Sequence, residues 1–141
     1  MSQEESNKAV VRRLIDEAFN KRNLAILPEL LHEEFVNHQD LLPVENKKGP
    51  AVFEELYVKM FRAYPDIRIE NHMMIADGDI VVIYDTLTGT NTGPMPDGRP
   101  ASGRTVEFEA INILRLKDNK VIDRWGLTDE LRMLKQLGII D

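Results

Sequence analysis

The chain contains no cysteine, which excludes disulfides, thiolate zinc sites and cysteine nucleophiles. It also lacks a long apolar run: the longest, residues 80–84, is far shorter than the about 20 residues of a membrane-spanning helix. Basic residues are few, since 18 Lys and Arg stand against 24 Asp and Glu, for a formal net charge of −6. Nucleic-acid binding calls for clustered Lys and Arg, so we expect neither a nucleic-acid partner nor a membrane.

What is present is the composition of an ordinary folded protein. Hydrophobic residues make up 43% and charged residues 30% of the 141 residues, which does not favour disorder. The length suits a single domain spanning 1–141 that buries its own core. The first residues are acidic and polar, unlike the basic and then apolar start of a signal peptide, so we expect a cytoplasmic protein.

The first third of the sequence has a helical pattern. Apolar residues recur every three to four positions over residues 10–19, after candidate caps at Ser6 or Asn7. Residues 24–31 predict a short second helix, and Pro50 suits the first turn of a third. The apolar face of this third helix consists of Phe53, Leu56, Tyr57, Met60, Phe61 and Tyr64.

After Pro65 the apolar pattern changes to period two, which predicts strands. Asp40, like the Asp residues at 77, 79 and 97, is expected to form a turn. A last helix ends at Gly138, a natural C-cap. Helices followed by consecutive hairpin strands predict an α+β fold, in which a curved, mainly antiparallel sheet wraps over the N-terminal helices and leaves a pocket. The predicted strands are 67–75, 80–90, 105–116 and 120–127.

Two further features concern the surroundings of this pocket. Residues 91–104 are rich in Gly and Pro, so we expect a mobile loop beside the pocket mouth, because loops of this length are often lids. The third predicted strand has one face that is apolar except for Asn112, and a second face that carries Ile111 and Ile113 among charged residues. Such a mixed face suits a partner sheet, so we expect a homodimer through it.

Asp129 is a candidate acid/base residue. Side chains alternate along a strand, so Val121, Trp125 and Asp129 are predicted to share one face. A carboxylate beside a large aromatic is partly desolvated, which raises its pKa toward the range useful for proton transfer. The alternative is that Asp129 caps the following helix, because Asp is a preferred N-cap. The residues alone leave both interpretations open.

Asp85 and His38 are the other ionisable candidates. Asp85 interrupts the apolar positions Val81, Ile83 and Leu87, so it is a buried carboxylate in need of a partner if that face points inward. His38 follows an apolar pair, and His changes charge near neutral pH, although a structural hydrogen bond is the alternative role. The three His residues share no metal-ligand spacing, so no metal site is expected.

Several phrases, in their order and spacing, resemble the SnoaL-like polyketide cyclases. This family belongs to the ketosteroid-isomerase-like, or nuclear-transport-factor-2-like, superfamily. The resemblance implies a cone-shaped α+β fold around a deep pocket, usually as a homodimer. The phrases are Val36-Asn37-His38, Tyr64-Pro65-Asp66, Gly89-Thr90-Asn91-Thr92-Gly93, Pro100-x-x-Gly103-Arg104-x-Val106, Ile111-Asn112-Ile113-x-Arg115, Lys120-Val121-Ile122-Asp123-x-Trp125 and Gln136-Leu137-Gly138.

The resemblance also implies an activity, the intramolecular aldol condensation that closes a ring in a hydrophobic polyketide-like carbonyl compound. This reaction requires no metal or organic cofactor if an acid/base group is well placed. In the family an Asp after the Trp of the last strand has this role, which Asp129 matches. The predicted catalytic residues are Asp129 and His38, and the predicted substrate pocket contains Asn91, Trp125, Asn112, Asp85 and Phe61.

Two positions depart from the family pattern. Asn91 stands where the family most often has His, and Asn112 stands where it usually has Asp. An amide can donate a hydrogen bond to an oxyanion but cannot exchange a proton near neutral pH. Two alternatives therefore stay open. One is a small-molecule-binding protein without catalysis, and the other is an epoxide hydrolase-like or isomerase activity, for which Asp129 and Asp85 would both have to face the pocket.

Overall fold

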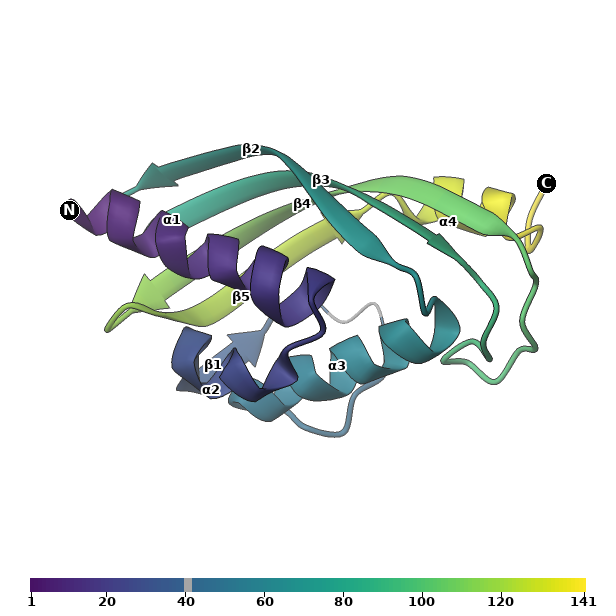
Figure 1. Cartoon of the computed structure of the whole chain (residues 1–141), viewed down its shortest axis with the longest axis horizontal. Coiled ribbons are helices and arrows are strands. Elements are labelled where there is room, and N and C mark those ends of the chain that lie inside the picture. Colours follow the sequence, from purple (N-terminus) through teal and green to yellow (C-terminus); the bar gives the residue numbers. More distant parts are fainter. Residues whose placement is uncertain (40–41) are drawn as a thin grey trace.

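The computed structural model describes residues 1–39 and 42–141, so the turn predicted at Asp40 lies outside the described residues. Helices come first and most strands follow, as predicted (Figure 1). The helical elements are α1 (Gln3–Arg13), a π-helix (Leu14–Asn20), a 3-10 helix (Leu24–Ile26), α2 (Leu27–Leu30), α3 (Pro50–Ala63) and α4 (Glu130–Gln136). The strands are β1 (Leu31–Asn37), β2 (Arg68–Asp77), β3 (Ile80–Thr90), β4 (Thr105–Lys117) and β5 (Lys120–Thr128).

All these strands belong to one five-stranded sheet, in the order β1-β5-β4-β3-β2. The pairs from β5 to β2 are antiparallel, and β1 joins β5 in parallel. Figure 1 shows the sheet arching over α1 and α3, with α4 near the C-terminus. The predicted α+β fold, with a curved and mainly antiparallel sheet over N-terminal helices, is confirmed.

Strand β1 is the element that the sequence pattern did not predict. Its buried residues Leu31 and Phe35 are four positions apart, a spacing more typical of a helix than of a strand. The spacing has a structural cause, because the pairing of β1 with β5 shifts register between Leu31 and Val36. Simple alternation is lost at such a shift, so the strand left no period-two pattern.

The helices begin at residues that provide their caps. Ser2, rather than Ser6 or Asn7, caps α1, and its hydroxyl accepts the Glu5 backbone N–H at 3.1 Å. Helix α3 begins after Gly49, whose φ of 81° suits glycine alone among the common residues. Both helices bury apolar residues in the core inside the arch. No helix of the described residues is long and apolar enough to cross a membrane.

Strand β5 contains an irregularity that reverses its two faces. Its pairing with β4 shifts by one residue just before Asp123. A β-bulge of this kind moves the following side chains to the opposite face. Val121 is therefore 0% exposed, whereas Trp125 pairs with Ile113 on the convex side of the sheet. The prediction that Val121 and Trp125 share one face with Asp129 is wrong for this reason.

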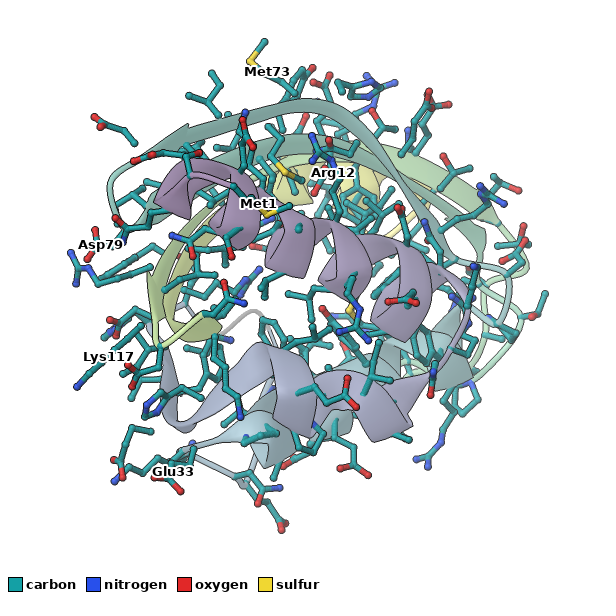
Figure 2. All side chains as sticks on the ribbon, turned by 60° about the vertical axis from the view of Figure 1, so that its left-hand side comes forward. Met1, Arg12, Glu33, Met73, Asp79 and Lys117 are labelled. Atoms are coloured by element: carbon teal, nitrogen blue, oxygen red, sulfur yellow. The ribbon has the colours of Figure 1, made fainter. Side chains whose placement is uncertain are left out.

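A similar shift occurs in β2. Asn71 pairs with Asp85, whereas Met73, only two positions later, pairs with Tyr84, the neighbour of Asp85 in β3. Asp85 is 1% exposed, but Met73 is 52% exposed and points away from the molecule in Figure 2. The bulge therefore lets the Asn71 side chain reach Asp85 while the rest of β2 turns apolar residues outward.

The convex side of the sheet carries apolar residues in two rows of cross-strand neighbours, which we call the outer-face patch. Leu127 is 70% exposed and Ile111 50% exposed in this patch. Soluble monomeric proteins rarely leave a contiguous apolar surface exposed to water, so a surface of this kind indicates an interaction site. The two rows are Met73, Tyr84, Ile111 and Leu127, and Ile75, Val82, Ile113 and Trp125.

Candidate active site

A cavity of about 300 Å³ lies between the concave face of the sheet, α3 and α4. Most of its wall is apolar, which together with this volume is typical of small-molecule sites. Polar side chains face the cavity from four neighbouring strands of the sheet. Among them are Asn37 of β1, Arg124 of β5, Asn112 of β4 and Asp85 of β3.

Asp85 is the buried carboxyl group of this wall, with 1% of its surface exposed. Its Oδ1 accepts a hydrogen bond from the Asn71 side-chain amide at 2.8 Å. Burial among apolar groups penalises the charged form and raises the pKa of Asp85, and the bond from Asn71 offsets this only in part. A carboxyl group with a raised pKa can take up and return a proton nearer to neutral pH than a solvated Asp can.

Arg124 is held on the same wall by two amides from neighbouring strands. Its Nε–H donates to Asn112 Oδ1 at 3.0 Å, and one terminal N–H donates to Asn37 Oδ1 at 2.9 Å. Because both amide oxygens accept from Arg124, the amide N–H groups of Asn112 and Asn37 point away from the guanidinium. The three side chains form an array of hydrogen-bond donors on the cavity wall, suited to an oxygen atom that becomes negative.

Gly126 makes this array sterically feasible. It pairs with Asn112 across β4 and β5. A Cβ atom at position 126 would lie 2.4 Å from Asn112 Oδ1 and 2.7 Å from an Arg124 terminal nitrogen. Both distances are far below van der Waals contact, so any other residue would displace one of these side chains. The glycine is needed here for close approach and not for an unusual backbone conformation.

Tyr57 of α3 closes the cavity opposite the sheet. It is 8% exposed and packs edge-on against Phe19, with ring centroids 5.0 Å apart. Burial raises the pKa of Tyr57 well above its ordinary value. Its hydroxyl group therefore stays neutral at physiological pH and can donate a hydrogen bond to an oxygen of a bound molecule.

Asp129 does not line this cavity. It is exposed and is the N-cap of α4, where its Oδ1 accepts the Arg132 backbone N–H at 3.2 Å. The predicted pocket position of Asp129 beside Trp125 is therefore wrong, and the capping interpretation describes its contacts. The physical reason is the bulge in β5, which turns the odd-numbered positions after Val121 to the convex side.

His38 and Trp125 also lie outside the cavity, on the convex side of the sheet. Their rings stack with centroids 4.7 Å apart and planes at 8°. His38 Nε2 lies 2.8 Å from Asp123 Oδ1, and the Arg115 guanidinium lies 5.2 Å from the Trp125 ring centroid. The structure thus gives His38 the structural hydrogen bond that was its alternative role, and it contradicts the predicted pocket position of Trp125.

Asn91 anchors the loop that follows β3. It is 0% exposed, its Nδ2 donates to the carbonyls of Ala63 and Gly93 at 3.0 Å, and its Oδ1 accepts the Ser102 N–H at 2.7 Å. With these bonds made, Asn91 serves the loop and not the cavity, contrary to prediction. The loop itself reaches the cavity mouth through Met95 and its neighbours. Its predicted mobility stays a prediction.

Phe61 lies behind the cavity wall. It is half-buried, packs against Phe19 with ring centroids 5.1 Å apart, and carries the Arg22 guanidinium 4.1 Å from its own ring centroid. Tyr57 and Phe19 stand in front of it and line the cavity, so the predicted pocket position of Phe61 is not observed. The apolar pattern of the helix assigns Tyr57 and Phe61 to one face, but it does not predict which of the two reaches the cavity.

Of the predicted pocket residues, Asp85 and Asn112 face the cavity together. Sequence reasoning missed Arg124, because neighbours in a strand point to opposite faces and its neighbour Trp125 is the residue expected in the pocket. It also missed Gly126, although a glycine inside a strand is a signal of close approach by another group. Tyr57 was seen only as part of an apolar helix face.

Comparisons with known proteins identify the family of this chain. The SnoaL-like polyketide cyclase family model matches residues 9–137. The aklanonic acid methyl ester cyclase DnrD of Streptomyces peucetius is 28% identical over 130 residues, covering 92% of this chain and 88% of DnrD.

Two solved structures show the same fold. TsrD from Streptomyces laurentii has a TM-score of 0.86 at 22% identity, covering 99% of this chain and 100% of TsrD. A structure from Jannaschia sp. CCS1, assigned to the SnoaL-like polyketide cyclases, has a TM-score of 0.84 at 24% identity, covering 100% of this chain and 98% of that one. The family resemblance of the sequence phrases is confirmed, and this chain belongs to the SnoaL-like polyketide cyclase family.

Proposed function

We propose that this chain closes a ring in a hydrophobic polyketide-like carbonyl compound by intramolecular aldol condensation, with Asp85 as the group that moves the proton. The observation that carries the proposal is a carboxyl group of raised pKa, 1% exposed, on the wall of an apolar cavity. Membership of the SnoaL-like polyketide cyclase family supports it, as does the likeness to an aklanonic acid methyl ester cyclase.

The reaction follows from the groups on the wall. The Asp85 carboxylate takes a proton from the carbon next to one carbonyl group, and the electron pair of that C–H bond forms an enolate. The enolate carbon attacks a second carbonyl carbon, which forms the new C–C bond and turns the second carbonyl oxygen into an alkoxide. Protonated Asp85 returns its proton to this alkoxide. Atoms and electrons balance without an oxidant or reductant, which is why we propose a cofactor-free reaction.

The donor array has a separate task in this scheme. Negative charge forms first on the enolate oxygen and then on the alkoxide oxygen. Arg124, already oriented by Asn112 and Asn37, is placed on the wall to stabilise such an oxygen together with the amide N–H groups. The neutral Tyr57 hydroxyl group is a further donor from the opposite side. Preorganised donors of this kind act more strongly on a mostly apolar wall than in water, because the local dielectric constant is lower there.

The alternatives can be weighed against the same contacts. The epoxide hydrolase-like activity relied on Asp85 and Asp129 facing one pocket, and Asp129 is instead an exposed helix cap. A binding protein without catalysis needs apolar cavity walls but no carboxyl group with a raised pKa. The raised pKa of Asp85 therefore favours an enzyme over a binding protein.

We also propose that the chain forms a homodimer through the outer-face patch. A two-fold axis would place the same apolar rows of two copies against each other, as a self-complementary interface requires. In the single chain Leu127 is 70% exposed and Ile111 is 50% exposed, which favours a partner surface that covers them. Residues that were expected in the pocket, Trp125 and His38, would then lie at or beside the interface.

The test of the catalytic proposal uses aklanonic acid methyl ester, the compound in the name of the DnrD enzyme, as the first substrate. Cyclised product is measured by chromatography, and proton removal is measured as deuterium uptake at the acidic carbon in D₂O. Asp85→Asn should lower turnover by about 10²–10⁴-fold, the usual contribution of general acid–base catalysis.

Asp129→Asn is the matched control, because Asn caps a helix nearly as well as Asp. It should keep turnover within about twofold of the wild type. Full activity in the Asp85 variant, or loss of activity in the Asp129 variant with an intact fold, would reject Asp85 as the proton-transfer group.

A further inference from the structure

The segment of residues 42–47, between β1 and α3, forms part of the cavity wall. Leu42, Pro43 and Val44 face the cavity, and Val44 is only 8% exposed. The segment has no helix or strand hydrogen bonds of its own to keep it in place. Its position must therefore come from contacts with neighbouring elements.

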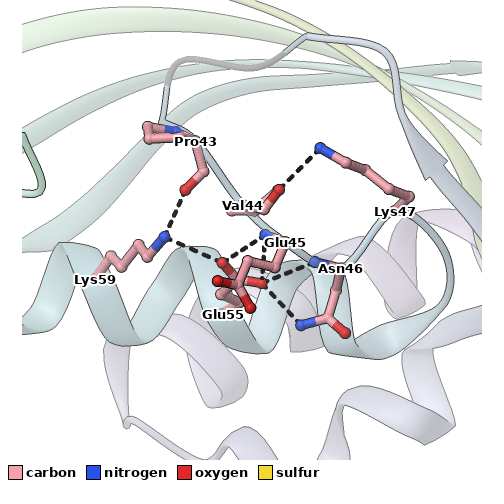
Figure 3. A network of polar contacts seen from close by, with 7 residues as sticks. All are labelled: Pro43, Val44, Glu45, Asn46, Lys47, Glu55 and Lys59. Carbon is pink, nitrogen blue, oxygen red and sulfur yellow. Dashed lines mark hydrogen bonds and ion pairs between the residues drawn. The ribbon is translucent and has the colours of Figure 1, made fainter.

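Val44 packs in the hydrophobic core, and Glu55 of α3 supplies polar contacts to the segment (Figure 3). Its Oε1 accepts the backbone N–H groups of Glu45 and Asn46 at 2.9 and 3.0 Å, and the Asn46 side-chain amide at 2.8 Å. Its Oε2 accepts the Glu45 N–H at 2.8 Å and the Lys59 ammonium at 3.0 Å. Lys59 in turn donates to the Pro43 carbonyl, so the segment is held through the backbone of Pro43, Glu45 and Asn46.

These bonds are strong because the carboxyl group is charged. The backbone N–H of Asn46 and then that of Glu45 lower the pKa of Glu55 to about 2, while burial acts in the opposite direction. A lowered pKa means that the stabilisation is present above the ordinary pKa of Glu and is lost only as the pH falls toward about 2. At neutral pH the carboxylate is ionised, and hydrogen bonds to it are charge-assisted.

The same helix also forms the cavity wall. Leu56, Tyr57 and Met60 of α3 line the cavity, whereas Glu55 and Lys59 reach from α3 to the segment above it in Figure 3. Glu55 and Lys59 are one helical turn apart, which allows them to contact each other and the segment at once. The pair therefore joins two pieces of wall that are separate in the sequence.

We propose that Glu55 and Lys59 are positioning residues that hold residues 42–47 against α3 and thereby set the affinity of the cavity for its ligand. The inference rests on the proposed function only in taking the cavity as the substrate site. Neither side chain is assigned a part in the chemical step, because neither lines the cavity.

The experiment compares Glu55→Gln with Glu54→Gln. Glu54 is the preceding residue of α3 and is exposed, so its variant has the same charge change without the contacts to the segment. Gln keeps the shape of Glu but replaces one acceptor oxygen with a donor NH₂ group, which faces the N–H groups of the segment. Lys59→Met is a second variant that removes the contact to Pro43.

Two measurements are made on each variant. Amide hydrogen exchange of Glu45 and Asn46 reports whether the segment is held, and the Kd of the apolar dye 1-anilinonaphthalene-8-sulfonate reports binding in the cavity. Glu55→Gln should speed exchange at both amides and raise the dye Kd roughly three- to tenfold, with Lys59→Met smaller in the same direction. Glu54→Gln should match the wild type in both.

A merely structural role would lower the melting temperature and leave the dye Kd unchanged. A lower melting temperature with an unchanged dye Kd would therefore overturn the proposal. Faster amide exchange without weaker dye binding would overturn it as well, and so would a wild-type protein that does not bind the dye. The dye assay needs no turnover, so it reports on the cavity whether or not the chain catalyses a cyclisation. If no cyclisation is found but Glu55→Gln weakens dye binding, the proposed reaction fails while the positioning role stands.

Discussion

The two faces of the sheet are built from the same strands and present opposite surroundings. On the concave face, Asp85, Asn112 and Arg124 are isolated polar groups in an apolar cavity, and hydrogen bonds fix each of them. On the convex face, apolar side chains such as Ile111 and Leu127 form rows in open solvent. This difference is the basis of our two proposals, a reaction on a small molecule at the concave face and a homodimer through the convex face.

Of the paired variants that compare the two faces below, the arginine pair should show the largest effect. Arg124→Gln takes away the charged donor of the cavity and should reduce turnover by about 10²–10³-fold, the cost of losing one oxyanion donor. Arg115→Gln changes an arginine of the convex face, which lies over Trp125, and should leave turnover within about twofold. Steady-state kinetics on the cyclised substrate gives both values.

Circular dichroism spectra must show that each arginine variant is folded before the rates are compared. Equal losses in the two variants would mean that the faces do not differ in the way proposed. A loss in Arg115→Gln alone would move the site to the convex face.

The convex face is tested by placing a charge in the outer-face patch, at its most exposed apolar residue in the sheet. Leu127→Lys should weaken association by roughly 2 kcal/mol or more, about thirtyfold in the dimer Kd, because the ammonium group loses water without gaining a partner. Sedimentation should then give a particle near the 16.2 kDa of one chain at concentrations where the wild type is a dimer.

Val58→Lys provides the control for this charge. Val58 is 38% exposed on α3, away from the sheet, so the same substitution there should not change the association state. A wild-type protein that sediments as one chain at micromolar concentration contradicts the dimer outright.

Gly126→Ala tests the close packing on the concave face. The added methyl group would meet Asn112 and Arg124 at less than 3 Å, so the strand or one of the side chains must shift. We expect a loss of roughly 1–3 kcal/mol in the free energy of unfolding, as for other overpacked interiors, and weaker substrate binding. Urea denaturation measures the first quantity.

Thr128→Ala changes the same face of β5 two positions later and removes atoms instead of adding them, so it should not displace Arg124. A Gly126→Ala variant as stable and as active as the wild type would show that the donor array tolerates displacement.

The regular strands explain what the sequence could predict. In β3 and β4 burial alternates without interruption, so spacing alone places Asp85 and Asn112 among the apolar residues of one face of each strand. It does not decide which face of β3 points inward. In β2 and β5 a bulge shifts the register, and alternation counted across it assigns side chains to the wrong face. Alternation counted across the bulge in β5 therefore predicts Trp125 in the pocket and does not point to Arg124.

Other parts of the site depend on contacts that no local pattern contains. Asn91 looks like an available amide in the sequence, yet a carbonyl of α3 and two positions of its own loop use its hydrogen-bonding groups. Asp129 satisfied both the cap and the catalytic patterns, and only the register of β5 separates them. Local propensity can name such residues but cannot assign their partners.

The smallest expected effect is a change in the pH dependence of stability on the concave face. Because burial raises the pKa of Asp85 in the folded state, the folded protein holds this proton to a higher pH than the unfolded chain does. Stability therefore falls as the pH rises from the unfolded pKa of about 3.9 through the folded value. Asp85→Asn removes this loss, since the amide oxygen of the new side chain can still accept the hydrogen bond from Asn71. The variant should be more stable than the wild type at pH 7 and lose that advantage in acid, as measured by urea denaturation at several pH values. An Asp85→Asn variant that is less stable than the wild type at pH 7 would show that the ionised carboxylate is well accommodated, and the raised pKa on which its acid/base role depends would have to be abandoned.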